Sequence, residues 1–176
     1  MTATSIPRPA TDEAAPFYQA YIAEVRGENI GDLLREQGVE VERLFQPLDD
    51  TRALERYAPG KWSVKEVLGH ITDAERIFAY RLLRIARGDK TPLPGFDEDA
   101  YVPAAHFDRR AVTELIEDFR AVRTSSRTLV GGIPQESWTL VGEASGKAIS
   151  ARALAYIMVG HVAHHVAVLR LRYRLG

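Results

Sequence analysis

The chain has 176 residues, a formal net charge of −1 and no cysteine. Its length is that of one domain with a substantial core, and its near-zero charge gives no support for a nucleic-acid partner. Without cysteine there can be no disulfide, thiolate metal ligand or cysteine nucleophile, so any metal must be held by histidine, carboxylate or water. The hydrophobic fraction of 45% and the charged fraction of 27% are those of a soluble globular protein.

No apolar run approaches the roughly 18 uninterrupted residues of a membrane span, and residues 1–9 lack the continuous apolar core of a secretory signal. We therefore expect a cytoplasmic protein that has no membrane partner. Pro7, Pro9 and small polar residues predict a loose N-terminal arm over residues 1–10. Residues 11–176 are then expected to form a single domain.

The first of four segments with apolar residues at helical spacing starts near Thr11. Gly27 and Gly31 weaken or break its pattern, which resumes and continues to Pro47. A short turn of helix is expected at residues 54–57.

The second and third segments carry clearer start signals. The second runs from Val64 to about Arg87, and Ser63 with Glu66 predicts a capping box at its start. The third covers residues 109–130 and is expected to be capped by Asp108.

The last segment, residues 151–175, is capped by Ser150. Residues 135–150 are rich in turn residues and suggest a short hairpin or a structured loop. Residues 91–108 form a long stretch without helical or strand periodicity, and a loop of this length is often functional. The four long helical segments predict an all-α four-helix bundle with long connections between helices.

Three of the five histidines lie within residues 160–165 of the last segment. In a helix, His161 and His165 fall one turn apart on one face. That face continues through apolar residues such as Leu154 and Ile157, so both imidazoles are expected to face the interior of the bundle.

Two adjacent buried imidazoles both need partners and repel each other when charged. A divalent cation satisfies both at once by binding one nitrogen of each neutral ring. A hydrogen-bonded core histidine and a solvent-facing pair are the ordinary alternatives at this spacing. A third histidine, His70, lies among apolar positions of the second helical segment and favours the metal.

Three stretches of this chain together resemble the DinB/YfiT superfamily: Lys61-Trp62-Ser63, Gly69-His70-Ile71-Thr72-Asp73-Ala74-Glu75 and Gly160-His161-Val162-Ala163-His164-His165. The order and the intervals of the histidines match the triad of that family. The resemblance implies a four-helix bundle that binds one divalent metal, with zinc or nickel preferred, through His70, His161 and His165. It also implies a homodimer in many members, and an activity such as thiol S-transfer with bacillithiol or mycothiol, or isomerisation.

The chain has two further histidines, His164 and His106. His164 lies three residues from His161, so helical geometry alone allows it to replace His165, although the family pattern favours His165. His106 lies in the long connection and is expected at the surface or in a pocket rather than on a metal.

Further side chains of the helices and connections could act around the metal. Asp73, one turn after His70, can orient His70 or be an ordinary solvated carboxylate. Arginines can line a pocket for an anionic substrate or simply lie exposed on the helices, namely Arg81, Arg84 and Arg123. Aromatic residues can form pocket walls or core, namely Trp62, Trp138, Phe96 and Tyr101.

Three histidines leave positions on a metal for substrate, which is the arrangement of a catalytic site. Because the chain has no cysteine, a thiol mechanism needs a small-molecule thiol as cosubstrate. The leading hypothesis is a metal-dependent transferase that conjugates such a thiol to an electrophile. The alternatives are a hydrolase on the same metal and a metal-binding protein without turnover. Small residues of the last helix suggest a homodimer contact, namely Ala153, Gly160, Ala163 and Ala167.

Overall fold

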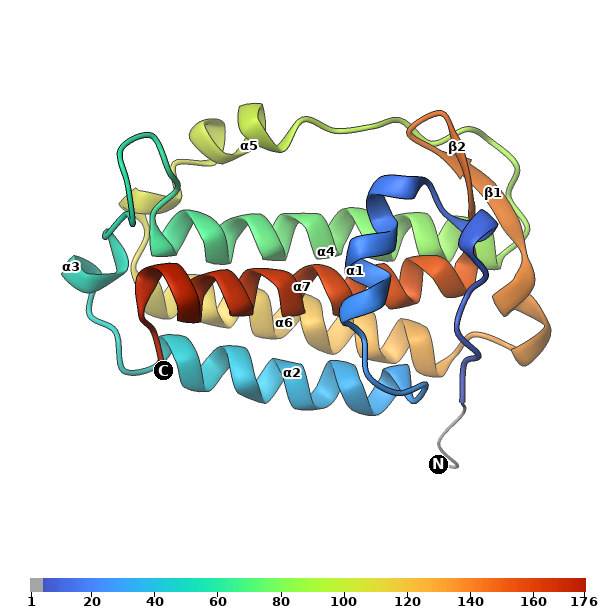
Figure 1. The fold of residues 1–176 in the computed structure, drawn as a ribbon, viewed down its shortest axis with the longest axis horizontal. Coiled ribbons are helices and arrows are strands. Elements are labelled where there is room, and N and C mark those ends of the chain that lie inside the picture. Colours follow the sequence, from blue (N-terminus) through green and yellow to red (C-terminus); the bar gives the residue numbers. More distant parts are fainter. Residues whose placement is uncertain (1–4) are drawn as a thin grey trace.

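Four long helices lie side by side in the computed structural model, which describes residues 5–176 (Figure 1). They are α2 (Ile30–Phe45), α4 (Val64–Ala86), α6 (Val112–Gly131) and α7 (Ala151–Tyr173). The predicted all-α four-helix bundle is confirmed.

Shorter elements connect and cover the bundle. They are η1 (Thr11–Glu13), η2 (Pro16–Tyr18), α1 (Gln19–Glu24), α3 (Asp50–Ala53), α5 (Glu98–Ala105), η3 (Phe107–Arg109), η4 (Gln135–Thr139), β1 (Val141–Ala144) and β2 (Lys147–Ser150). The two strands form an antiparallel hairpin in which Val141 is paired with Ser150. This hairpin confirms the expectation for residues 135–150.

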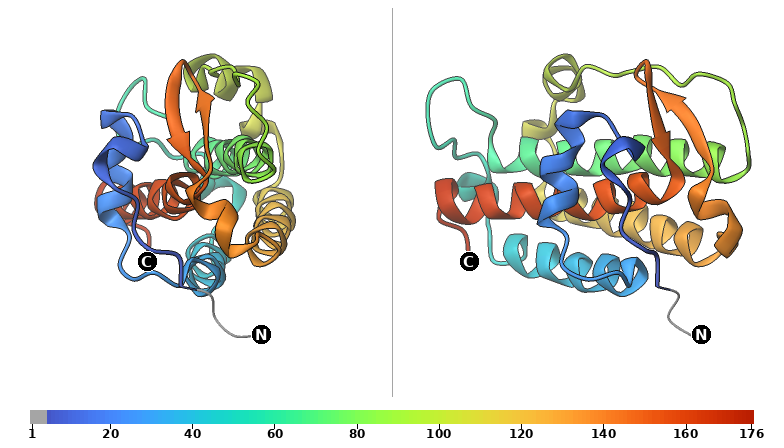
Figure 2. Two further views of the ribbon diagram at one scale, coloured as in Figure 1. Left: turned by 90° about the vertical axis from the view of Figure 1, so that its right-hand side faces the viewer. Right: turned by 45° about the vertical axis from the view of Figure 1, so that its right-hand side comes forward.

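The topology of the bundle is not a simple up-down-up-down arrangement. In Figure 1, α4 and α6 run in one direction and α2 and α7 in the other. The neighbouring helices α4 and α6 are therefore parallel, which requires a long crossover between them. Residues 87–111, which include α5, provide this crossover above α4 (Figures 1 and 2).

The start signals of two long helices are confirmed. The hydroxyl of Ser63 accepts a hydrogen bond from the amide of Glu66, whose carboxylate accepts one from the Ser63 amide, so the capping box of α4 is present. The Ser150 hydroxyl accepts a hydrogen bond from the Ala153 amide at the start of α7.

Other sequence expectations were wrong. Residues 91–108 are not a plain loop, because they contain α5, which Asp97 caps with its carboxylate. Asp108 does not cap α6, since it lies in η3 and binds the Ser63 hydroxyl. The short helix expected at residues 54–57 lies earlier, at α3.

The predicted N-terminal arm is described from residue 5 onward, and residues 1–4 lie outside the described part of the chain. Residues 5–10 form no helix or strand, yet the side chain of Ile6 is only 2% exposed. The Ile6 carbonyl accepts a hydrogen bond from the Tyr156 hydroxyl. Arg8 also donates to the carbonyls of Ile22 and Val25, so this part of the arm is attached to α1 and α7.

Among the described residues, α7 is the one helix with the length and composition of a membrane span. Arginines and histidines interrupt its apolar residues, so it holds no uninterrupted apolar run of the length of a span. Within the bundle, 61% of its most apolar window is buried, so core packing accounts for its apolar character. The cytoplasmic location stays a prediction.

A polar layer divides the core of the bundle at mid-height. Apolar clusters lie toward both ends of the helices. Between them, Arg123 of α6 and Glu75 of α4 form an ion pair at 2.6 Å, with exposed fractions of only 4% and 1%. Gln37 of α2 accepts from Arg123 and donates to the Val159 carbonyl of α7. The layer thus connects all four long helices.

Loss of one partner of this ion pair should be costly, because it leaves a buried charge unpaired. We expect Arg123→Met to lower the free energy of unfolding by about 3–5 kcal/mol. Arg120→Met on the same helix removes an exposed pair with Glu42 and should cost far less. Urea denaturation of both variants gives the comparison. Equal losses in the two variants would contradict this account of the polar layer.

Candidate metal centre

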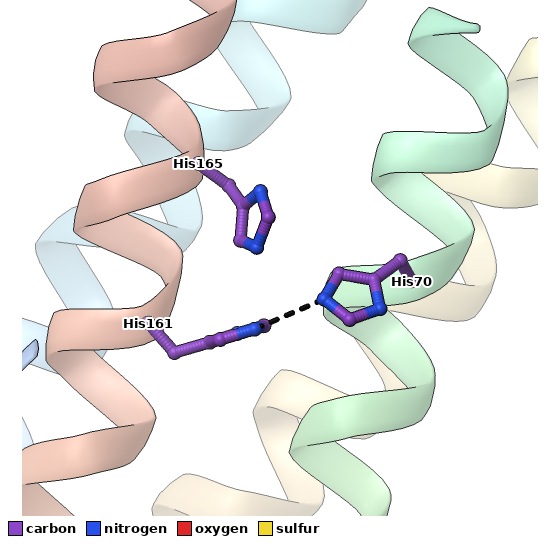
Figure 3. A group of neighbouring side chains, drawn as sticks. All are labelled: His70, His161 and His165. Atoms are coloured by element: carbon purple, nitrogen blue, oxygen red, sulfur yellow. Dashed lines mark hydrogen bonds between the residues drawn. The ribbon is translucent and has the colours of Figure 1, made fainter. Parts of the chain in front are cut away.

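Helices α4 and α7 bring together the three histidines that the sequence singled out. His70 lies in α4, and His161 and His165 lie one turn apart in α7, which packs against α4 (Figure 3). One nitrogen from each ring lies within 4.8 Å of the others. No other group of three or more histidine, aspartate or glutamate side chains in residues 5–176 converges in this way.

Glycines next to the histidines allow close packing around them. A Cβ at Gly160 would lie 1.9 Å from the Tyr21 carbonyl oxygen, because α1 crosses α7 at this point. A Cβ at Gly69 would lie 2.4 Å from the Phe107 ring. Each Gly-His pair therefore lets another element pack directly against the backbone beside a histidine.

The three rings are held in the neutral form. Burial lowers the pKa of His70 to about 4 and that of His165 to about 3. Burial also lowers the pKa of His161 well below its usual value, and the neighbouring histidines lower it further. His70 and His161 are 6% and 4% exposed, and His165 is half-buried.

The donor set fits a divalent cation. Neutral imidazoles are suitable ligands for zinc, nickel and related metals. The Nε2 atoms of His70 and His161 lie 3.0 Å apart. Two nitrogens that bind one ion at about 2.1 Å are separated by about 3.0–3.4 Å when their bonds lie at about 90–110°. This contact is therefore compatible with a shared ion and, without an ion, with a hydrogen bond between one protonated and one free nitrogen.

Aromatic rings surround the cluster. The Trp62 ring lies 4.7 Å from His70, and the rings of Tyr21 and Phe78 lie 5.3 and 5.5 Å from His161. Of the two alternatives that the sequence left open for the tryptophans, pocket wall or core, Trp62 lies beside the site. Trp138 is buried in the core toward the hairpin end. Phe96 and Tyr101 contact each other and do not line the pocket beside the histidines.

A pocket of about 310 Å³ opens beside the cluster. It is bordered by Tyr57, Gly60, Lys61, Trp62, Val67, Asp99, His164, His165, Val168 and Tyr173. Because His165 belongs to both the cluster and the pocket wall, a ligand in the pocket can reach the histidines.

The remaining candidates have other roles. His164 is exposed and borders the pocket, with its ring 5.1 Å from that of His165, and it is not part of the converging group. His106 is exposed and ends α5 in a left-handed conformation. Asp73 accepts a hydrogen bond from Arg76 and makes none to His70. Burial raises the pKa of Asp73.

The arginines are less uniform than the sequence suggested. Arg84 is half-buried and paired with Asp89. Arg81 and Arg123 are buried, so the alternative of an exposed helix side chain is wrong for these two. Glu75, the buried partner of Arg123, was not predicted from the sequence as a site residue. Its signal was a charged residue placed within the apolar stripe of α4.

The fold and the site together are those of a helical-bundle protein with a candidate metal centre, in which three neutral imidazoles converge beside a pocket. The family model described as the DinB superfamily matches residues 33–169. Because this match covers more than half of the chain, the chain belongs to the DinB superfamily. The resemblance seen in the sequence is therefore confirmed.

Two solved structures are similar to the chain. YfiT from Bacillus subtilis, described as a probable metal-dependent hydrolase with an unusual four-helix bundle topology, has a TM-score of 0.75 at 15% identity over 96% of this chain and 93% of that chain. The mycothiol-dependent maleylpyruvate isomerase has a TM-score of 0.65 at 15% identity over 82% of this chain and 61% of that chain. These likenesses show the shared fold. No curated protein sequence gives a significant match.

The neutral cluster predicts a pH-dependent stability for metal-free protein. Since the pKa of His70 falls from 6.5 to about 4 on folding, the unfolded chain binds more protons between these values, and stability must fall as the pH drops. From pH 7 to pH 5 His70 alone should cost about 2 kcal/mol. Urea denaturation of metal-stripped protein measures this loss.

Two variants test the source of the loss. His70→Gln should remove only the share of the loss that belongs to His70, about 2 kcal/mol between pH 7 and pH 5, because His161 and His165 keep their own contributions. His164→Gln, which changes an exposed side chain, should follow the wild-type protein. An unchanged slope in His70→Gln would contradict a neutral buried His70.

Proposed function

We propose that the chain binds one divalent cation, zinc or nickel, through His70, His161 and His165 and uses it as a metal-dependent enzyme. The observation that carries the proposal is the convergence of three neutral nitrogens within 4.8 Å at the wall of a pocket. A structural site would be closed by a fourth protein ligand. Here the fourth side is the pocket, which is suited to a small-molecule substrate.

The reaction we propose is the transfer of a low-molecular-weight thiol to an electrophile. A bound cation would supply Lewis acidity, which favours the deprotonated form of a thiol at neutral pH. The thiol sulfur forms a bond to the electrophilic carbon as the leaving group departs with its electron pair, and the thiol proton passes to solvent. The aromatic residues Tyr57, Trp62 and Tyr173 would hold the apolar part of the substrate.

Hydrolysis is the second candidate for the same site. It is supported by the similarity to YfiT, which extends over 96% of this chain. In this case water replaces the thiol as the nucleophile, and the pocket holds an ester or amide. A metal-binding protein without turnover is the remaining alternative.

The homodimer stays a prediction. Among the small residues that suggested it, Ala153 is fully buried and Gly160 is covered by α1 of the same chain. Of the four small residues, only Ala163 and Ala167 retain exposure, so a partner helix that uses this set would have to pack against these two.

Metal content tests the ligand set. His161→Ala should reduce bound metal to near background, because two remaining imidazoles do not complete the site. His164→Ala is the matched control on the same turn and should retain the metal. Elemental analysis of purified proteins at equal concentration gives the result. Loss of metal in His164→Ala but not in His165→Ala would show that the assignment within this pair is wrong.

Turnover tests the reaction. Metal-loaded protein should conjugate bacillithiol, mycothiol or a simpler thiol to a halogenated or epoxide substrate, and His70→Ala should reduce the rate to the uncatalysed level. Product formation is followed by mass spectrometry. Cleavage of esters or amides without thiol transfer would favour the hydrolase instead. If neither the thiol and electrophile pairs nor the esters and amides are turned over, the result would favour a metal-binding protein without enzymatic activity.

A further inference from the structure

The border of the pocket beside the histidines contains one positive and one negative side chain. Lys61 lies in the connection between α3 and α4, and Asp99 lies in the first turn of α5. Neither the Lys61 ammonium nor the Asp99 carboxylate makes an ion pair or a side-chain hydrogen bond with another of residues 5–176. The other border residues are aromatic, aliphatic, glycine or histidine. Both charges are therefore available to a molecule in the pocket.

Charged residues close to these two in sequence have partners within the protein. Arg56 forms ion pairs with the carboxylates of Glu66 and Asp108. The carboxylate of Asp97 accepts hydrogen bonds from two amides of the first turn of α5 and so caps this helix. These charges hold the fold together, whereas the two in the border of the pocket have no such role.

The backbone that carries the two free charges is held in place. Nη1 of Arg56 donates to the Lys61 carbonyl at 2.7 Å, and the Tyr173 hydroxyl donates to the Trp62 carbonyl at 2.6 Å. The Asp99 amide donates to the carboxylate that caps α5, at 3.0 Å. Each charged side chain therefore starts from a fixed point at the pocket, which lowers the cost of ordering it around a ligand.

The pair of opposite charges indicates what kind of molecule the pocket accepts. An anion would be attracted by Lys61 and repelled by Asp99, and a cation would meet the reverse. A molecule with both charges gains from each residue. The walls formed by Tyr57, Trp62 and Tyr173 displace water and strengthen these interactions. Because the volume of about 310 Å³ is near the lower limit for ligand sites, both charges must belong to one small molecule.

We propose that the pocket binds a small zwitterion, with its carboxylate at Lys61, its ammonium at Asp99 and its sulfur toward the three histidines. The inference rests on the proposed function for the reacting end and narrows the thiol to one built on an amino acid. The connection to the histidines is direct, since His165 borders the same pocket and the Trp62 ring lies 4.7 Å from that of His70.

Binding of matched thioethers to metal-free protein tests the zwitterion site. The zwitterions are S-methylcysteine and methionine, which differ in the distance from the charges to the sulfur. Each is compared with the acid that lacks the ammonium, 3-(methylthio)propionate or 4-(methylthio)butyrate. It is also compared with the amine that lacks the carboxylate, 2-(methylthio)ethylamine or 3-(methylthio)propylamine. Chemical-shift titration of ¹⁵N-labelled protein at pH 7 gives the dissociation constants. At least one zwitterion should bind about three- to fivefold more tightly than its acid and its amine, the factor expected for a partly exposed ion pair.

Variants assign each charge to its partner. Lys61→Gln should remove the advantage of the zwitterion over the amine and keep its advantage over the acid. Asp99→Asn should give the opposite pattern. Both side chains are exposed and have no partner in residues 5–176, so both variants should fold as the wild-type protein does. The matched controls are Glu98→Gln, beside Asp99 but outside the border of the pocket, and Lys147→Gln in the hairpin. Both controls should keep both advantages.

Two results would overturn the inference. One is a wild-type protein in which neither zwitterion binds more tightly than its acid and its amine. The other is the absence of the crossed pattern, either because Lys61→Gln and Asp99→Asn keep both advantages or because the control variants lose them equally. In the latter case the general field of the protein would explain the preference.

Failure of the proposed function gives a different result. Protein that takes up no metal or shows no turnover should still prefer the zwitterion, since Lys61 and Asp99 do not depend on the ion and the titration is done without it. Metal uptake and turnover without a zwitterion preference would leave the proposed function intact and remove the zwitterion site.

Discussion

The polar layer in the middle of the bundle is the constraint on which both fold and site depend. Each long helix contributes to it, with Gln37 in α2, Glu75 in α4, Arg123 in α6 and the Val159 carbonyl in α7. The buried imidazoles lie next to this layer. Buried polar groups are tolerated only when their hydrogen-bonding capacity is used. Glu75, Arg123 and the side-chain amide of Gln37 hydrogen-bond one another. The imidazoles use only part of their hydrogen-bonding capacity, through the single contact between His70 and His161.

This difference in hydrogen bonding indicates a structural role for the ion pair and a functional role for the imidazoles. The Glu75–Arg123 pair is complete and fixes four helices relative to one another. Gln37 reaches the carbonyl of Val159, two residues before His161, so the network ends beside the site. A rigid frame of this kind holds the imidazoles in place before any ligand arrives, which reduces the cost of binding.

Close backbone packing is the second requirement for this arrangement. At Gly69 and Gly160 a ring or a backbone from another element occupies the space of a side chain. The elements concerned are η3, which carries Phe107, and α1, which carries Tyr21, whose ring lies 5.3 Å from that of His161. The glycine before each histidine therefore has a packing role, which explains the Gly-His pairs in physical terms.

The sequence was sufficient for the features that depend on local pattern. Helical periodicity, the capping box at Ser63 and the cap at Ser150 predicted the long helices, and the spacing of His161 and His165 predicted a shared face. The features it did not reveal depend on tertiary contacts. Burial of Arg81 follows from the segments that cover it, and the pairing of Glu75 with Arg123 joins residues on different helices. The helix α5 was missed because its proline and acidic residues resemble those of a loop.

The crossover that contains α5 adds a connecting segment to the border of the site. Asp99, in the first turn of α5, borders the pocket on one side of the histidines. Burial raises the pKa of Tyr18 and Tyr21, and the charge of Glu98, beside Asp99 in sequence, raises both further. The start of this helix therefore lies near the pocket and near Tyr21, whose ring contacts His161. A pocket of about 310 Å³ is near the lower limit for ligand sites, so Asp99 at its border limits which small molecules fit. The long helices therefore position the histidines, while connecting segments, residues 57–62 and the start of α5, complete the border of the pocket through which a small molecule can reach them.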